Sequence, residues 1–366
     1  MYKNELPFLN VIRGSSALLV LFFHFFIFFF DQQPFCAKLL NVEPLDLTDP
    51  FYLSYINAIP FNIGHLGVSF FFLMSGFFIQ PSLEKYNLIR PFLVHKFLRL
   101  WPCYAFCFAL GLLFVYGFSL LRDDIFPYSF SHMLSYFFWT RDIFHYSYID
   151  GAVWSLEIQV KYYIFAALMW YFWRHKFFEV MTFSLLLLCV MGYAINAMGW
   201  VEGSSYEYFV YVFNRNIKFF LFITLGICFY EYYKKKISTL KLFMFVFLLM
   251  GCFLSIASFS IPFKMPLMNS YCLGLALFAG SIFFKALGHK NVGYGTKAMG
   301  WVAKISYPLY IGHVLPGYTI LYYLLEQGAN VYLALIAALV PLFPIAYFAH
   351  EKIEKVFAGI KTERRA

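Results

Sequence analysis

Charged residues are scarce in this chain of 366 residues, since Asp, Glu, Lys and Arg together make up only 13% of it. Hydrophobic residues make up 62%, and Phe alone occurs 50 times. A water-soluble domain carries more charge on its surface and needs much less apolar material than this. The composition therefore excludes an ordinary soluble protein and indicates that the lipid bilayer is the solvent of the chain.

Cysteine is also scarce, and the sequence shows no repeat. There are seven cysteines, and most lie inside apolar stretches, which is typical of small hydrophobic residues rather than of a disulfide framework. Their spacing fits no metal-ligand motif, so we expect no metal site. We find no low-complexity tract and no internal repeat of the kind that marks the two halves of many transporters.

Long apolar stretches recur along the whole chain, separated by short segments with charged residues, Pro or Gly. Their lengths suit helices that cross a bilayer, which need about 17 to 25 residues. The sequence therefore predicts an all-α, polytopic membrane protein, with residues 1–366 forming a single integral-membrane domain and no appended soluble domain. About ten transmembrane helices are expected, near residues 8–30, 61–80, 92–118, 152–173, 179–199, 213–233, 240–260, 266–286, 305–325 and 331–350.

Basic and acidic segments alternate between these spans. The segments after the second, fourth, sixth, eighth and tenth spans are rich in Lys and Arg, whereas the intervening ones are acidic or mixed. Because basic loops stay in the cytoplasm, both termini are predicted to be cytoplasmic. The net charge of +9 follows from this topology, so we expect no nucleic-acid partner.

Two ionisable residues interrupt the first span, NVIRGSSALLVLFFHFFIFFF. Arg13 and His24 are eleven residues apart, which places them within about 20° of one helix face and roughly 16 Å apart along the axis. In one alternative, Arg13 merely extends to the interface and His24 bonds a neighbouring helix. A functional role is favoured, because ionisable groups at mid-membrane depth are costly and usually face a cavity or pathway.

Later spans carry further polar residues. Glu157 and Lys161 in GAVWSLEIQVKYYIF are spaced as an internal ion pair, although a carboxylate near the outer end of a span can also orient an imidazole or accept a sugar hydroxyl. Tyr310 and His313 share a helix face in ISYPLYIGHVLPGY, where packing against another helix is the alternative. Ser75 lies among glycines in GHLGVSFFFLMSGFFI, whose default role is close helix packing.

Lys96 and Arg99 in HKFLRLWPCY lie at the predicted cytoplasmic interface. The positive-inside bias alone explains them. They are also the residue types that bind the phosphoryl oxygens of a cytoplasmic ligand.

These segments together resemble the membrane-bound acyltransferase family 3. The first span is similar to the family's Arg followed by ten residues and a His, here Arg13 and His24. GHLGVSFFFLMSGFFI, KFLRLWPCY and WSLEIQVKYY resemble its next three signatures, and ISYPLYIGH and KIEKVF, with Glu354, resemble two late ones. Six signatures in the right order are specific where any one would be weak. The resemblance also implies a ten-helix architecture.

The chain departs from the family pattern at three positions. It has Asn10 where the family often has Asp, Gln159 where it often has Glu, and Val356 where it has Pro. The residue that orients His24 is therefore open, and Glu157 is the candidate.

The resemblance implies transfer of an acyl group, most commonly acetyl from cytoplasmic acetyl-CoA, to a hydroxyl of a cell-surface or exported glycan such as a lipopolysaccharide or exopolysaccharide. It favours the bacterial cytoplasmic membrane and implies acyl-CoA, a glycan or glycolipid acceptor and membrane lipids as partners. His24 would be the general base and Glu157 a second catalytic residue. The donor's phosphates would bind Arg13, Lys96 and Arg99. Substrate binding is expected of Trp154, Tyr310, His313 and Ser75, and of these Tyr310, His313 and Ser75 could donate to an oxyanion.

Other interpretations stay open at this point. The acyl group could pass through a covalent intermediate on the protein. The buried ionisable residues could instead line the pathway of a transporter or glycan exporter, or the chain could be a non-catalytic scaffold. The sequence does not define the oligomeric state.

Overall fold

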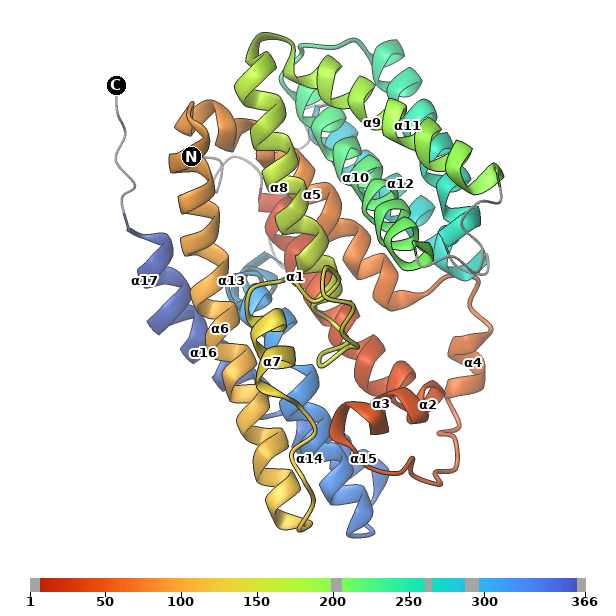
Figure 1. The fold of residues 1–366 in the computed structure, drawn as a ribbon, viewed down its shortest axis with the longest axis vertical. Helices are drawn as coiled ribbons and strands as arrows, with labels where there is room; N and C mark the ends of the chain where they lie inside the picture. The colour runs from red at the N-terminus through yellow and green to blue at the C-terminus, as the bar shows by residue number, and fades with distance from the viewer. Residues whose placement is uncertain (1–6, 199–205, 261–264, 287–295, 361–366) are drawn as a thin grey trace. The chain divides into compact units, whose positions relative to one another are not determined.

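The computed structural model describes residues 7–198, 206–260, 265–286 and 296–360, and every regular element among them is a helix (Figure 1). Eight helical stretches of this part of the chain are long and apolar enough to cross a membrane. The chain is thus an all-α, multi-pass membrane protein, as the sequence predicts. The count of eight differs from the predicted ten for two reasons. The stretch Trp154–Ala197 contains two helices, and the span expected at 305–325 is divided at His313 into two helices that are each too short to be counted.

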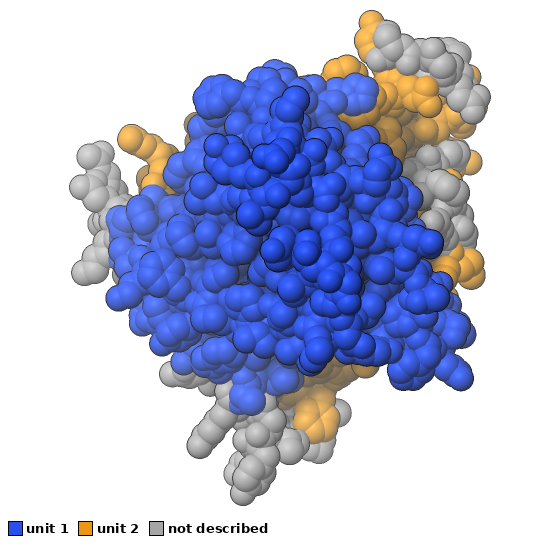
Figure 2. Space-filling view, turned by 90° about the horizontal axis from the view of Figure 1, so that it is seen from below, with its two compact units in different colours: residues 1–67, 95–154, 292–361 blue, residues 68–94, 155–291, 362–366 orange. Residues whose placement is uncertain are grey.

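The chain divides into two compact units, coloured blue and orange in Figure 2. Unit 1 consists of residues 1–67, 95–154 and 292–361, and unit 2 of residues 68–94, 155–291 and 362–366. The boundaries fall inside two long helices, α5 (Ile63–Tyr86) and α6 (Ile89–Leu121), and at the first residue of α8 (Trp154–Trp173).

Unit 1 begins with α1 (Pro7–Phe23), which continues through a π-helical turn (His24–Phe28) into α2 (Phe29–Asp31). Two shorter helices follow, α3 (Gln33–Leu40) and α4 (Leu53–Asn57), and α7 (Phe130–Phe137) comes after α6. The C-terminal part comprises α13 (Thr296–Gly312), α14 (Val314–Glu326), α15 (Val331–Leu339), α16 (Leu342–Ala349), a second π-helical turn (His350–Glu354) and α17 (Lys355–Ala358).

Close contacts align α1 with α13, which lies beside it (Figure 1), and the π-helical turn that follows α1 contacts α14. A Cβ atom on Gly14 would lie 2.8 Å from the carbonyl oxygen of Met299, and one on Gly317 would lie 2.2 Å from the ring of Phe25. Both positions require glycine because backbone or ring atoms occupy the space of a side chain. Residues 14 to 25 therefore run in the same direction as residues 299 to 317.

Helix α6 also runs along α13 in the same direction. The hydroxyl of Tyr307 donates to the carbonyl of Leu100 at 2.7 Å. Further along, a Cβ on Gly312 would lie 3.2 Å from Cys107, and one on Gly111 would lie 3.0 Å from Leu315. The three helices α1, α6 and α13 thus form one parallel group, which positions the site described below.

Unit 2 contains most of α5 and α8, followed by α9 (Phe177–Ala197), α10 (Glu207–Tyr233), α11 (Thr239–Ser260) and α12 (Met265–Ala286). Helix α10 packs against α9, α11 and α12, and most of its residues are buried. It crosses α5 where Gly76 meets Gly226, since a Cβ on either glycine would overlap the backbone of the other helix. Small residues let two helices approach in lipid, where no hydrophobic effect drives their association.

Candidate active site

The π-helical turn His24–Phe28 lies in the second half of the first span, Phe8–Asp31. It forms because the N–H of Phe29 donates to the carbonyl of His24, five residues back, instead of four. The hydroxyl of Tyr318 in α14 donates to the same carbonyl at 3.0 Å. Single π-helical turns inside α-helices are frequent at functional sites, because they change the direction of the side chains they carry.

The imidazole of His24 is buried and contacts two groups of unit 1. Its Nδ1 lies 3.1 Å from the carbonyl oxygen of Val20 and 2.9 Å from Nε2 of His313. The two rings are tilted, with centroids 4.8 Å apart. Two histidines that are 289 residues apart in the chain thus form one hydrogen-bonded pair.

His313 occupies the break between α13 and α14 and is 1% exposed. Its Nδ1 lies 3.1 Å from the carbonyl oxygen of Leu309 and 2.9 Å from that of Tyr310. The local sequence favours such a break, because Pro308 lacks an N–H and Gly312 weakens the helix. The sequence suggested that His313 binds substrate, and the structure places its free ring nitrogen against His24.

Aromatic residues extend the site within unit 1. The rings of His65 and Trp154 are 5.8 Å apart, and His65 interacts electrostatically with His24. The hydroxyl of Tyr310 donates to the carbonyl of Ala152 at 3.0 Å, which ties α13 to the segment that precedes α8. The predicted substrate residues Trp154 and Tyr310 therefore belong to the same unit as the histidine pair.

The predicted donor-binding cations lie toward one end of unit 1. Arg13 precedes His24 by eleven residues, roughly 16 Å along the helix. In α6, Cys107 contacts Gly312, the residue next to His313. Arg99 lies eight residues before Cys107, so it is roughly 12 Å from that level, toward the same end of unit 1 as Arg13. Lys96 is one turn further and is buried. No carboxylate of the described residues forms an ion pair with Arg99.

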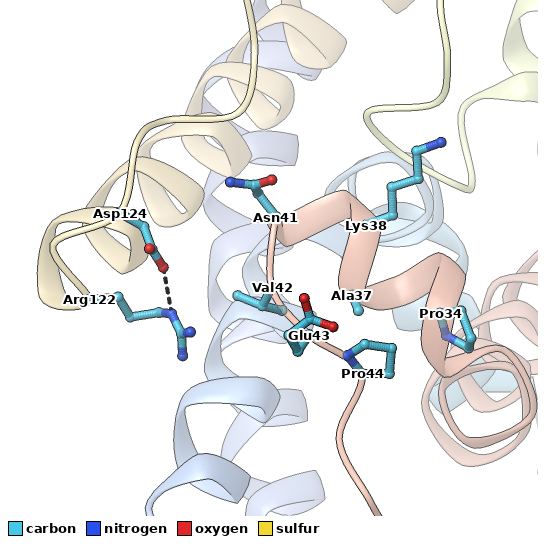
Figure 3. A pocket seen from close by; sticks show the side chains of 9 residues that line it. All are labelled: Pro34, Ala37, Lys38, Asn41, Val42, Glu43, Pro44, Arg122 and Asp124. Carbon is cyan, nitrogen blue, oxygen red and sulfur yellow. Dashed lines mark hydrogen bonds and ion pairs between the residues drawn. The ribbon is translucent and has the colours of Figure 1, made fainter.

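The opposite end of unit 1 carries carboxylates and a polar pocket. The pocket has a volume of about 430 Å³ and is lined by Pro34, Ala37, Lys38, Asn41, Val42, Glu43, Pro44, Arg122 and Asp124. Figure 3 shows the ion pair of Arg122 with Asp124 at its side, 2.9 Å long, and Arg122 also pairs with Glu326. These residues follow the C-terminal end of α6 and the turn after α2, so they lie beyond His24 as seen from Arg13.

Two predicted site residues belong to unit 2. Glu157 is 1% exposed in α8. The hydroxyl of Ser75 donates to the carbonyl of Phe71 at 2.8 Å and accepts a hydrogen bond from the amide of Gln159, whose amide also donates to Tyr163 at 2.7 Å. Gln159, a departure from the family pattern, therefore joins α5 to α8.

The sequence analysis missed a partly buried histidine and several buried ionisable residues. His65 stood in the GHLG segment that was interpreted as packing, and its imidazole was the available signal. Asp150 is 3% exposed in the loop before α8, and burial raises the pKa of its carboxyl to about 7. Arg215 and Lys218 are buried in α10, where charge inside a span was the signal. Among the described residues, no three His, Cys, Asp or Glu side chains could together hold a metal ion.

Comparison with protein families gives one match over nearly the whole chain. A family model described as an acyltransferase domain, of acyltransferase family 3, matches residues 6–350. No curated protein and no solved structure matches the chain. The match includes both histidines of the pair and the three cations.

Proposed function

Because the chain belongs to the acyltransferase 3 family, we propose that it transfers an acetyl group from cytoplasmic acetyl-CoA to a hydroxyl of a cell-surface or exported glycan. The single observation that supports this most strongly is the arrangement along α1. Cations lie at one end of unit 1, and a buried imidazole lies roughly 16 Å further along the same helix face. Its Nε2 forms no hydrogen bond with the residues of unit 1 that the structure describes.

The donor suits the cationic end. The nucleotide part of CoA carries phosphates, which Arg and Lys bind through charge-assisted hydrogen bonds. Arg13, Lys96 and Arg99 would hold these phosphates at the cytoplasmic surface, as the positive-inside rule predicts for this end. The long, flexible arm of the donor would then extend along α1 toward His24.

The chemistry requires one base. Nε2 of His24 takes the proton of the acceptor hydroxyl while the hydroxyl oxygen forms a bond to the thioester carbonyl carbon. The tetrahedral oxyanion collapses, the carbon–sulfur bond breaks, and the leaving thiolate takes the proton back from His24. The products are the acetyl ester and free CoA, and the imidazole returns to its neutral state.

The acceptor suits the opposite end of unit 1. The polar pocket beside Arg122 and Asp124 offers amide, ammonium and carboxylate groups of the kind that bind sugar hydroxyls. With the cationic end in the cytoplasm, this pocket faces the outside of a bacterial cytoplasmic membrane. In this proposal, Glu157 remains the second catalytic candidate and Trp154 a substrate-binding residue.

The test uses membranes that contain the chain, membranes without it, and membranes with the variant His24→Ala at an equal protein level. Isotope-labelled acetyl-CoA is added, and the membrane glycans are analysed by mass spectrometry. We expect labelled acetyl esters only with the unmodified chain. Labelling that is equal in all three membranes, or uptake of glycan or metabolite with no acetyl transfer, would contradict the proposal.

A further inference from the structure

Hydrogen bonding fixes the protonation of the ring of His313. Its Nδ1 contacts the carbonyl oxygens of Leu309 and Tyr310, which can only accept hydrogen bonds. Nδ1 of His313 must therefore carry a hydrogen. In a neutral ring the other nitrogen, Nε2, then has a lone pair and can only accept.

The same reasoning extends to His24. Its Nδ1 lies between two acceptors, the carbonyl oxygen of Val20 at 3.1 Å and Nε2 of His313 at 2.9 Å. If Nδ1 of His24 had no hydrogen, it would face the carbonyl lone pair at close range. The contact with His313 would then require a doubly protonated, cationic His313. A buried cation without a carboxylate partner is costly, so the neutral arrangement is favoured.

We propose that His313 is a positioning residue that fixes His24 as the Nδ1–H tautomer and leaves Nε2 of His24 unprotonated. No described residue of unit 1 forms a hydrogen bond with Nε2 of His24. The direction of this hydrogen bond, from Nδ1 of His24 to Nε2 of His313, is set by the two carbonyls behind His313.

The inference rests on the proposed function and deepens it. A general base needs a lone pair on the nitrogen that meets the substrate, and the wrong tautomer presents a hydrogen there instead. When Nε2 of His24 takes the acceptor proton, the ring becomes cationic. Its Nδ1–H then donates a stronger hydrogen bond to the same fixed acceptor.

The first arm of the test is spectroscopic and independent of activity. Nitrogen-15 solid-state spectra of histidine-labelled protein in lipid distinguish protonated from unprotonated ring nitrogens, and the chain has nine histidines. The variants His24→Ala and His313→Gln assign the two signals. We expect both rings to have a protonated Nδ1 and an unprotonated Nε2. A protonated Nε2 on His24 would overturn the inference, even if the protein transfers acetyl groups.

The second arm is kinetic and compares three variants. His313→Leu removes the acceptor, so we expect kcat to fall by roughly 10-fold to 100-fold with an unchanged KM for acetyl-CoA. His313→Gln places a carbonyl oxygen near the position of Nε2 and should restore most of kcat. Tyr307→Phe, which removes a partly buried hydrogen bond of α13, should leave kcat within about 2-fold.

Failures of the two proposals can be told apart. If the unmodified chain transfers no acetyl group, the proposed function fails, whereas the spectra still test the tautomer. If the chain is active and His24→Ala is not, but His313→Leu retains full kcat, the positioning role fails alone. A fall in kcat that His313→Gln does not reverse would indicate loss of packing and would also count against it.

Discussion

The two π-helical turns of unit 1 each begin with a histidine, yet they place it in different surroundings. In His24–Phe28 the first histidine is buried and its partners are a backbone carbonyl and a second imidazole. In His350–Glu354 it is less buried, and its Nδ1 lies 2.7 Å from the carboxylate of Glu354. The same backbone geometry recurs, since the N–H of Lys355 donates to the carbonyl of His350, five residues back.

This difference shows that the turn alone does not make a base. In the second turn, a carboxylate oxygen of Glu354 is the partner of Nδ1 of His350. A neutral partner inside lipid favours a neutral ring with one free lone pair. The neighbours, and not the helix type, distinguish His24 from His350.

The largest expected effect is the contrast between His24→Ala and His350→Ala. We expect kcat to fall by about 10²-fold to 10⁴-fold in His24→Ala, because a general base contributes that much. His350→Ala should change kcat by less than about 3-fold, since the partners of His350 are Glu351 and Glu354 and not the histidine pair. Labelled acetyl transfer by membranes with equal protein content measures both. An equal fall of kcat in the two variants would contradict the assignment of different roles to His24 and His350.

A second, smaller contrast concerns two arginines of unit 1. Arg99 forms no ion pair with a described carboxylate, whereas Arg122 is held by Asp124 and Glu326. The hydrogen bond that Arg122 donates to Asp124 raises the pKa of Arg122. We expect Arg99→Gln to raise the KM for acetyl-CoA about 10-fold, the cost of one charged hydrogen bond. Arg122→Gln should leave that KM unchanged.

Donor titrations at a fixed acceptor level measure both constants. The assignment of the cationic end would be wrong if Arg122→Gln raised the donor KM as much as Arg99→Gln does. An unchanged donor KM in both variants would remove Arg99 from the proposed phosphate site. Arg13 and Lys96 would then be the remaining candidates for binding the donor phosphates.

The sequence predicts the spans and one face of the site, but not the pairing that completes it. Hydropathy and loop charge place the helices because lipid imposes those patterns on every span. The spacing of Arg13 and His24 follows from helix geometry alone. The contact between His24 and His313 joins residues 289 positions apart and depends on a π-helical turn and a helix break. A local sequence pattern cannot predict a contact between two residues that are so far apart in the chain.

The smallest expected effect concerns Asp150, a buried acid that lies outside the spans and whose pKa burial raises. Its Oδ1 accepts from the N–H of Ala152 at 2.7 Å, but desolvation dominates and raises its pKa from 3.8 to about 7. The folded state therefore binds a proton that the unfolded chain releases. The free energy of unfolding should fall as pH rises from about 4 to about 7 and stay constant above that range.

Asp150→Asn keeps an acceptor oxygen without the charge, so it should remove this loss. At pH 8 we expect the variant to be more stable than the unmodified chain by about 1 kcal/mol, because relaxation and water reduce the full penalty. At pH 4 the two should unfold at the same temperature. Thermal unfolding in detergent at both pH values measures this, with Asp49→Asn, at an exposed carboxylate, as the matched control. A stabilisation that is equal at pH 4 and pH 8 would mean that packing, and not the buried charge, separates Asp150 from the histidine pair.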